Sequence, residues 1–507
     1  MLDCFHPTMV RRTLRPLAGG ALLALLFVAI APAAQPDRAR QLSLAALERA
    51  DAQWDERAAL LWTSTRPDGA RGHGVRPTAW YALGLLLRDG PGDQERAVRA
   101  IEAVLRHQIH EPGQPWHGTF FRRAEEPRPL ARAKMWDDYD PNWRQFIGCV
   151  FAQALLHYED RLPADLPDRL EQAIARALEG EQAHGRLRPH YTNIALMHGF
   201  LLGFAGERLA RAGWTTEAEE WVGEIHREFE AHQSFDEYNS PTYYGVDLYG
   251  LALLREHGAT AGLRTAGATM EAALWQDIAR FYHAGLHNLA GPFDRSYGMD
   301  LRRYVALVGV WMGFVLPEAQ TPLPDLRRPA RHTNDFLFTP CFALLGAQVP
   351  DDVIPHLRAF QGERQVRRPI ADGRRVATAW LADTVMIGAE STAWSRGVPQ
   401  PNSQFHPATV HWQLPGGDVG WLALRECSRV NATAAPHQLT IEAIGPATFR
   451  IHAPGLASEA VTRDRWSLPG LLIDVSTDAI AWSSRRDGDA VEITYTDATR
   501  FDLRLTP

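Results

Sequence analysis

Hydrophobic residues recur with helical spacing along most of the chain, from about Leu42 to Phe360. In the stretches LSLAALERADAQWDERAALLW and AVRAIEAVLRHQI, apolar positions follow one another at intervals of three and four residues, which places them on one face of an α-helix. The strict alternation typical of strands is scarce in this region. The pattern therefore predicts a mainly helical N-terminal part.

Several of these helical segments begin in the same way, with a proline near the start of an apolar run. Proline suits the first turn of a helix, because its missing N–H would have no partner there and its φ is already helical. Asp140 and Ser240 directly precede two of these prolines and are good N-cap residues. The six prolines are Pro77, Pro141, Pro189, Pro241, Pro292 and Pro340.

These prolines follow one another at intervals of 64, 48, 52, 51 and 48 residues. Each interval has room for two helices, and the second is more charged, as in DLPDRLEQAIARALEG. A helix-pair unit of about fifty residues, repeated about six times, predicts an (α/α)6 toroid over residues 35–360. In such a ring the apolar helices form a parallel inner layer, so their N-terminal ends open on one face.

The pattern changes after about residue 361. Short alternating runs such as ATVHWQL, QLTIEAI, AVEITYT and RFDLRLT are separated by Gly, Pro and Asp turns. This alternation is typical of antiparallel strands with one buried face. Residues 361–507 are therefore predicted to form an antiparallel β-sandwich.

The N-terminus has the pattern of an export signal. Arg11, Arg12 and Arg15 precede an apolar run over residues 17–30, and the Ala-Pro-Ala sequence at 31–33 offers a cleavage site. The run is shorter than the ~20 residues that span a bilayer. We expect residues 1–34 to be a cleaved signal peptide of a bacterial protein that is periplasmic or secreted, with no stable membrane insertion afterwards.

Composition excludes some classes of partner and cofactor. The formal net charge of −7 gives no basic surface for nucleic acid. Three cysteines remain after signal cleavage, far apart in sequence and without CxxC spacing, which argues against a disulfide framework or a zinc site. No His/Asp cluster has metal-ligand spacing, so we expect no cofactor and no catalytic metal, and leave a structural ion in the sandwich open.

Polar and aromatic residues gather in the first turns of the predicted inner helices. Because those turns would share one mouth, we expect their side chains to line a common cleft; the alternative is that they only cap and staple the helices. The residues are Trp80 and Tyr81, then Asn142, Trp143 and Arg144, then His190 and Asn193, then Tyr243 and Tyr244, and finally Arg295 and Tyr297.

Four short strings resemble, in chain order, segments of one group of enzymes. They are NWRQFIG at 142–148, HYTNIAL at 190–196, NSPTYYG at 239–245 and DRSYG at 294–298. They are similar to the Asn-Trp…Ile-Gly helix, the Asn-Asn-His helix, the Ser-Pro-x-Tyr segment and the substrate-binding arginine of the toroid polysaccharide lyases, which include heparinase II/III-like, alginate and chondroitin lyases. The doubled Asn is missing, and His190 precedes Asn193 instead of following it.

The resemblance implies β-elimination of a uronic-acid-containing glycan. That reaction requires donors that neutralise the uronate carboxylate, a base for the C5 proton and an acid for the leaving oxygen. Tyr243 matches the family's catalytic tyrosine and is predicted to be the base, the acid or both, with Tyr244 close behind. A helix N-terminus and nearby Arg favour phenolate. His190 and Asn193, three residues apart on one helix face, are expected to clamp the carboxylate, with Asn142 and Arg295 as the next candidates.

Other polar and aromatic residues are expected to bind the sugar chain. For His406, a structural role beside Pro407 is the alternative, and for the tryptophans it is burial in the core. The set of predicted substrate-binding residues is Asn142, Trp143, Arg144, Trp116, His117, Asn239, Tyr297 and His406, and Trp136 is a further stacking candidate.

Two rival functions stay open. An inverting glycoside hydrolase on the same toroid needs two carboxylates that face each other across the cleft. A glycan-binding protein without catalytic activity needs only the aromatic residues. The candidate acids are Asp137, Asp138, Asp140, Asp236, Glu237, Asp294 and Asp300.

Overall fold

Four consecutive helix pairs make up most of the N-terminal part. They are α2 (Val75–Arg88) with α3 (Asp93–Arg106), α4 (Trp143–Tyr158) with α5 (Leu166–His184), α6 (Thr192–Arg208) with α7 (Ala212–His232), and α8 (Tyr243–His257) with α9 (Ala261–Phe281). The computed structural model describes residues 34–64, 71–370, 373–398 and 403–507. The predicted signal peptide lies outside the described residues, apart from Ala34.

The two helices of a pair differ in burial, as their sequences predict. In α8 every residue from Tyr244 to Arg255 is buried, so the helix is covered on all sides. In α7 the buried residues are Ala218, Val222, Ile225 and Phe229, whose spacing places them on one face. The first helix of each pair is therefore an inner helix and the second covers it from outside.

The inner helices form a closed ring. Helices α2, α4, α6, α8 and α10 (Leu307–Val315) pack in chain order, and α10 packs on α1 (Ala34–Asp51). Helix α1 contacts α11 (Thr339–Ala343), which returns to α2. Close packing depends on glycine: a Cβ on Gly245 would lie 2.4 Å from the carbonyl carbon of Leu307. The predicted toroid is confirmed.

One of the expected inner helices is not present. No helix begins at Pro292, because residues 293–296 pair instead with the β-domain: Phe293 and His406 exchange backbone hydrogen bonds of 2.9 and 3.1 Å, and the Ser296 N–H donates to the Gln404 carbonyl over 2.8 Å. The helix of this repeat is delayed to Leu307. The helix at Pro340 is also shorter than expected, with five residues.

The C-terminal part is one antiparallel sheet. After α12 (Ile354–Arg358) it comprises β6 (Arg364–Ile370), β7 (Arg375–Ala382), β8 (Val385–Ser391), β9 (Ala408–Gln413), β10 (Val419–Glu426), β11 (Arg429–Ala435), β12 (Gln438–Ile444), β13 (Ala447–His452), β14 (Arg465–Leu468), β15 (Leu471–Thr477), β16 (Ala481–Asp487), β17 (Ala490–Thr496) and β18 (Arg500–Thr506). Small sheets in the toroid contain β1 (Trp54–Asp55), β2 (Leu60–Ser64) and β3 (Arg71–Gly74), and β4 (Tyr282–His283) and β5 (Asn288–Leu289).

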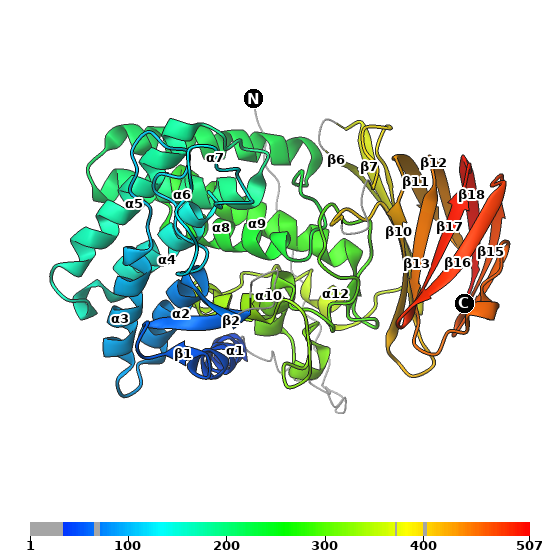
Figure 1. Cartoon of the computed structure of the whole chain (residues 1–507), viewed down its shortest axis with the longest axis horizontal. Coiled ribbons are helices and arrows are strands. Elements are labelled where there is room, and N and C mark those ends of the chain that lie inside the picture. The colour runs from blue at the N-terminus through cyan, green and yellow to red at the C-terminus, as the bar shows by residue number, and fades with distance from the viewer. Residues whose placement is uncertain (1–33, 65–70, 371–372, 399–402) are drawn as a thin grey trace, which may run out of the picture.

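The large sheet folds over on itself. Phe449 of β13 packs against Trp466 of β14 and Phe501 of β18, with ring centroids 5.6 and 5.2 Å apart. These strands are far apart in the sheet order β14-β15-β18-β12-β11-β8-β9-β10-β13-β17-β16, so the two layers enclose one core. The predicted antiparallel β-domain is confirmed, and Figure 1 shows it beside the toroid.

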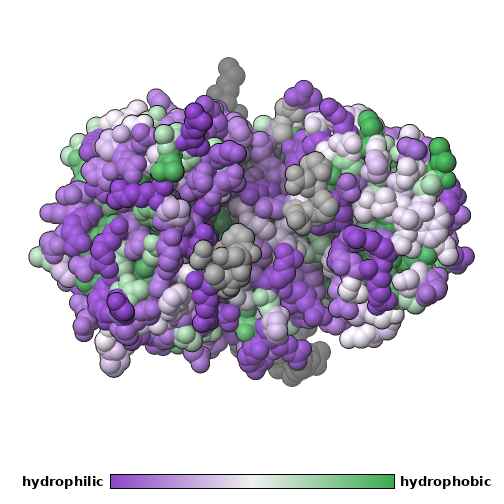
Figure 2. All heavy atoms as spheres, viewed as in Figure 1, coloured by the Kyte–Doolittle hydropathy of each residue, from purple (hydrophilic) through white to green (hydrophobic). Residues whose placement is uncertain are grey.

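One face of the protein is mostly polar, and the described cysteines form no disulfide bonds. Polar residues predominate on the face of the toroid shown in Figure 2, with only scattered hydrophobic ones. Cys149, Cys341 and Cys427 are free and buried. Among the described residues, no helix is long and apolar enough to cross a membrane, and no His, Cys, Asp and Glu side chains cluster as metal ligands would.

Candidate active site

A cavity of about 530 Å³ lies where the inner helices begin. Because these helices run parallel in the ring, their first turns converge on it. They contribute Arg76 and Trp80, then Asn142 and Trp143, then Tyr191 and Asn193, and then Thr242 and Tyr243. Arg295, Tyr297, His332 and Asp335 come from the irregular segments that close the ring. The expected convergence of first turns is thus present in the structure.

Tyr243 is the most engaged side chain of this cavity. Its phenol oxygen accepts a 2.6 Å hydrogen bond from Nη2 of Arg295 and lies 2.5 Å from the phenol oxygen of Tyr297. The Arg295 guanidinium also lies 3.7 Å from the centre of the Tyr243 ring. One cation therefore contacts both the face and the oxygen of this phenol.

Burial nevertheless raises the pKa of Tyr243 well above its ordinary value. The neighbouring Tyr297 raises this pKa further, and the charge of Arg295 lowers it without reversing the shift. The sequence predicts that the helix N-terminus and Arg295 favour phenolate, but the shift of this pKa runs in the opposite direction. In the resting site Tyr243 is a neutral phenol, which is a proton donor.

Arg295 connects Tyr243 to a buried carboxylate. Its Nη1 donates to Oε1 of Glu237 over 2.6 Å, and its Nε donates to the side chain of Gln404 over 3.0 Å. The amide of Asn193 donates to the other oxygen of Glu237. Burial raises the pKa of Glu237, and the charge of Arg295 opposes this. A hydrogen-bonded chain thus runs from Asn193 through Glu237 and Arg295 to Tyr243.

A histidine and an aspartate lie on the side of Tyr297. The His332 ring stacks on the Tyr297 ring, with centroids 4.3 Å apart, and its Nδ1 is 3.8 Å from Oδ2 of Asp335. Burial lowers the pKa of His332 to about 4 and raises the pKa of Asp335 to about 6. At neutral pH the imidazole is uncharged, so one of its ring nitrogens has a lone pair.

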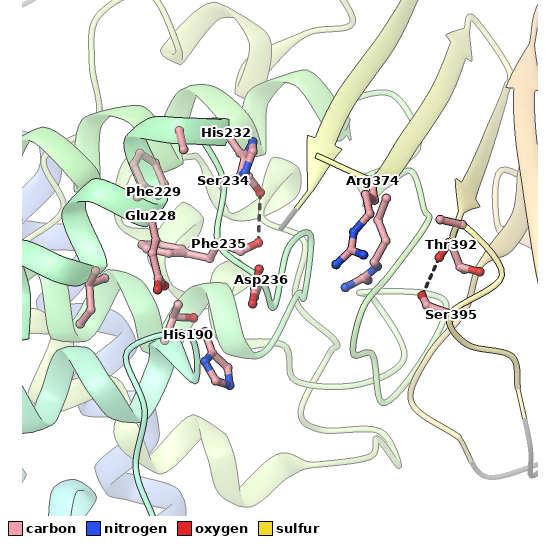
Figure 3. A pocket seen from close by; sticks show the side chains of 15 residues that line it. His190, Glu228, Phe229, His232, Ser234, Phe235, Asp236, Arg374, Thr392 and Ser395 are labelled. Atoms are coloured by element: carbon pink, nitrogen blue, oxygen red, sulfur yellow. Dashed lines mark hydrogen bonds between the residues drawn. The ribbon is translucent and has the colours of Figure 1, made fainter. Parts of the chain in front are cut away.

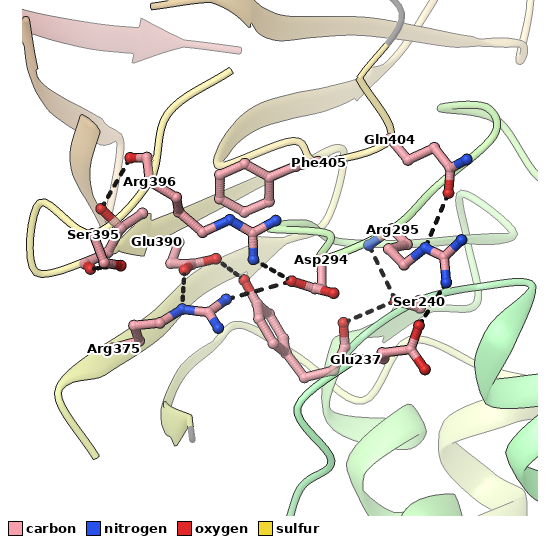
Figure 4. A network of polar contacts seen from close by, with 12 residues as sticks. Glu237, Ser240, Asp294, Arg295, Arg375, Glu390, Ser395, Arg396, Gln404 and Phe405 are labelled. Carbon is pink, nitrogen blue, oxygen red and sulfur yellow. Dashed lines mark hydrogen bonds and ion pairs between the residues drawn. The ribbon is translucent and has the colours of Figure 1, made fainter. Parts of the chain in front are cut away.

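The β-domain positions the segment that carries Arg295 and Tyr297. Arg375 and Arg396 both bind Oδ1 of Asp294, over 3.4 and 2.5 Å, as Figure 4 shows. Arg375 also binds Glu390 over 2.8 Å, and Glu390 accepts a hydrogen bond from Tyr238 of the toroid. Arg295 is therefore fixed by both parts of the chain.

Two of the predicted catalytic residues lie away from this cavity. Tyr244 is buried in the core, where its hydroxyl donates to Asp277 over 3.0 Å. His190 is exposed. Because α6 begins at Thr192 and not at Pro189, His190 lies before the helix and does not share a helix face with Asn193. The expected His190–Asn193 clamp is not formed.

His190 lines a second cavity of about 630 Å³. Figure 3 shows that this cavity lies between the end of α7, which contributes Glu228 and His232, and the β-domain, which contributes Arg374 and Thr392. Asp236, one of the candidate acids, also lines it. The two neighbours His190 and Tyr191 therefore serve different cavities.

Three of the predicted substrate-binding residues stabilise the loop before α4. The guanidinium of Arg144 is buried, pairs with Glu181 over 3.1 Å and donates to the carbonyl of His117. Trp116 is buried against Tyr139 and donates to Glu111 over 2.7 Å. None of Arg144, Trp116 and His117 lines the cavity, because the loop folds against α5.

Asn239 and His406 also have structural contacts. The Asn239 amide donates to the carbonyls of Ala290 and Pro292, over 2.7 and 2.8 Å. His406 is buried, with Nε2 3.3 Å from the Ser296 carbonyl. Both hold the segment that leads to Arg295 and Tyr297, which favours the structural alternative for His406.

Some residues of the cavity were not predicted. Tyr191, His332, Asp335 and Arg76 line it, but none of them belongs to a motif that distinguished them from their neighbours. Arg76 follows the helix-start rule and could have been found from its position beside Pro77. His332 and Asp335 directly follow a Pro- and Arg-rich stretch that interrupts the helical pattern, and Asp335 lies in a short 3₁₀ helix, Thr333–Phe338, that no sequence pattern indicates.

The ring of paired helices, the folded antiparallel sheet and the shared mouth place this protein in the class of toroid proteins with a C-terminal β-domain. The structure is similar to that of the chondroitin AC lyase of Streptomyces coelicolor A3 in complex with chondroitin sulphate, with a TM-score of 0.50 and 11% identity over 94% of this chain and 80% of that chain. It also matches a crystal structure of heparinase III, with a TM-score of 0.42 and 11% identity over 96% of this chain and 86% of that one. At this identity the likeness concerns the fold.

The family is defined by sequence. The model of a domain of unknown function, DUF8769, matches residues 40–347, which is more than half of the chain, so the chain belongs to that family. A second domain of unknown function, DUF8770, matches residues 360–483. The search of curated proteins finds no match to this chain.

Proposed function

We propose that the protein is a polysaccharide lyase that cleaves a uronic-acid-containing glycan by β-elimination. One observation carries the proposal: the Tyr243 phenol lies at the shared mouth of the inner helices with Arg295 bonded to its oxygen and stacked on its ring. A proton-transfer group held by a fixed cation suits a reaction in which charge develops and moves between neighbouring atoms.

In this proposal Tyr243 donates the proton and His332 accepts one. The raised pKa of Tyr243 keeps its phenol protonated, so that it can protonate the O4 oxygen as the C4–O4 bond breaks. The lowered pKa of His332 keeps its imidazole neutral, so that it can take the C5 proton. Asp335, 3.8 Å from His332, stabilises the imidazolium that forms.

Two amides supply donors for the uronate carboxylate. The Asn142 side chain is fixed by a 3.0 Å bond to the Tyr191 hydroxyl and a 2.7 Å bond from Arg186, and the Asn193 side chain is fixed by Glu237. An amide NH₂ has two hydrogens, so each amide has one left for a ligand. Arg295, the other predicted candidate for this role, donates one hydrogen bond from each guanidinium nitrogen to a protein group, which fixes its position beside Tyr243.

The rim of the cavity suits a sugar chain. Trp136 is 46% exposed and lines the cavity, so its indole is available to pack on a sugar ring. Trp143 also lines the cavity, but it is buried and packs against the Arg76 guanidinium. The proposed ligand is an acidic poly- or oligosaccharide. Export to the periplasm or beyond, expected from residues 1–34, belongs to the same proposal, and fractionation of cells that express the full chain tests it.

An exchange experiment tests the two proton-transfer roles separately. In D₂O, with a uronate oligosaccharide, Tyr243→Phe should form no unsaturated product, measured by ultraviolet absorbance, but should still exchange the C5 proton, measured by NMR. His332→Gln should do neither. Loss of exchange in Tyr243→Phe would show that Tyr243 itself is the base. Absence of unsaturated product from the wild-type protein on all uronate glycans would exclude the lyase.

A glycoside hydrolase is the second candidate, because two carboxylates line the same cavity. Burial raises the pKa of both Asp140 and Asp335. The other candidate acids do not line it, and Asp294 is neutralised by arginines of the β-domain. A hydrolase releases reducing ends without the absorbance of a C4–C5 double bond, so the same assay separates the two reactions. A binding protein gives neither signal.

A further inference from the structure

Three arginines line the cavity, and they differ in what they bind. Arg295 donates from all three of its nitrogens, to Glu237, Gln404 and Tyr243. Arg122 does the same, to Glu126 over 2.7 Å and to the carbonyls of Trp136 and Asp137 over 2.9 and 2.7 Å. The guanidinium of Arg76 forms no hydrogen bond or ion pair with any residue in the described part of the chain.

The position of Arg76 is fixed by aromatic rings instead. Its guanidinium carbon lies 4.9 Å from the centre of the Trp80 ring, 4.8 Å from that of Trp143 and 4.6 Å from that of Phe146. Cation–π attraction holds a guanidinium in such a place and leaves its N–H groups without acceptors. The Nε atom is buried and unpaired. A half-buried donor set without acceptors costs free energy unless a ligand satisfies it.

Two carboxyl groups lie near Arg76 but do not neutralise it. The charge of Arg76 lowers the pKa of Asp140 and of Asp335, yet neither carboxylate is within ion-pair distance of it. The Asp140 carboxylate accepts a 3.0 Å hydrogen bond from the backbone N–H of Asn142. The positive charge at this wall is therefore available to a ligand that enters the cavity.

We propose that Arg76 is an anion-binding subsite that recognises an oxyanion of the glycan, either a uronate carboxylate or a sulfate ester. The planar guanidinium, oriented by the aromatic rings, can bind two oxygens of one acidic group at once. This proposal rests on the proposed function only in taking the ligand to be an acidic glycan. It adds to the two amide donors a charged contact for an acidic group, on α2 and on a wall separate from Tyr243 and Arg295.

Binding measurements on a catalytically blocked protein test the subsite. In a Tyr243→Phe background, calorimetry compares Arg76→Met, which keeps the packing volume, with Arg76→Lys, which keeps the charge. The ligands are a uronate oligosaccharide, its carboxyl-reduced form and a sulfated form of the carboxyl-reduced chain. Arg132→Met is the matched control, because Arg132 is exposed and lies outside the cavity.

We expect Arg76→Met to weaken binding of an acidic chain by about 10- to 100-fold, the usual effect of losing hydrogen bonds to a charged group. Arg76→Lys should lose less, and the carboxyl-reduced chain and the Arg132→Met control should show no change. The acidic chain that responds identifies carboxylate or sulfate as the group bound. An equal loss with the neutral chain, or no loss with either acidic chain, would overturn the proposal. Arg76-dependent binding without any unsaturated product from the wild-type protein would remove the lyase and leave the subsite standing.

Discussion

The two walls of the cavity are built in opposite ways. On the wall formed by α8 and residues 294–297, the guanidinium of Arg295 is satisfied by Glu237, Gln404 and Tyr243. On the wall formed by α2 and α4, the guanidinium of Arg76 lies among aromatic rings without an acceptor. A satisfied network holds a reacting group in one geometry before the substrate arrives, whereas an unsatisfied donor gains its partner only on binding. Under the proposed function, this difference suits the first wall to chemistry and the second to recognition.

The largest expected loss of turnover comes from substitution of Tyr243, on the wall formed by α8 and residues 294–297. Tyr243→Phe should lower turnover by about 10³-fold or more, since a general acid contributes about 10²- to 10⁴-fold. Tyr244→Phe is a closely matched control: it removes the same atom from the next residue, but from the core contact with Asp277. It should cost about 1–3 kcal/mol of stability and leave turnover intact. Initial rates of double-bond formation and urea unfolding measure the two effects, and loss of turnover in Tyr244→Phe would contradict the assignment of the walls.

A smaller effect is expected at Arg295. Lysine has no planar fork and cannot reach Glu237, Gln404 and Tyr243 together. Arg295→Lys should therefore lower kcat by about 10²-fold and leave KM nearly unchanged, because the lost contacts lie within the protein and not to the substrate. Steady-state kinetics distinguish this from a rise in KM with kcat retained, which would move Arg295 to the recognition wall.

The smallest expected effect is a pH dependence of stability that originates beside Arg76. Burial raises the pKa of Asp335 from 3.8 to about 6, while the charge of Arg76 opposes the shift and His332 lies 3.8 Å away. Between these two pKa values the folded protein holds a proton that the unfolded chain releases, so this contribution to stability is present near pH 4.5 and is lost as pH rises through 6.

Comparison with Asp335→Asn isolates that contribution. Relative to the wild type, the variant should become more stable by about 2 kcal/mol between pH 4.5 and pH 7.5, given about 1.4 kcal/mol per pKa unit. Urea unfolding at the two pH values measures the difference. A difference between variant and wild type that does not change with pH would show that the carboxyl group is ionised throughout and that Arg76 is neutralised by it.

The sequence predicts the fold and the residues in the first turns of the inner helices better than the rest of the site. Helical periodicity and helix-start prolines locate α2, α4, α6 and α8, and with them Asn142, Asn193 and Tyr243, because a position in the first turn fixes where a side chain points. The prediction is wrong at His190, because α6 begins at Thr192, three residues after the proline that is expected to start it.

The remaining differences arise from contacts that local sequence does not encode. The helix expected at Pro292 is replaced by pairing with residues 404–406, more than a hundred positions later in the chain. Trp116 and His117 lie in a loop that packs against α5 and not against the cavity. His332 and Asp335 reach the cavity because the ring closes there, and ring closure is a property of the whole chain.

The pairing of residues 293–296 with the β-domain has a consequence for how this protein can be divided. A fragment that ends after α12 would retain Tyr243, Asn193 and the aromatic rings around Arg76. The segment with Arg295 and Tyr297 would lose Gln404, Arg375 and Arg396 as partners. The β-domain is in this sense a component of the candidate active site, although none of its described residues lines the cavity. Gene fusions or truncations that treat the two family domains as interchangeable modules would leave the cation that contacts Tyr243 without the partners that position it.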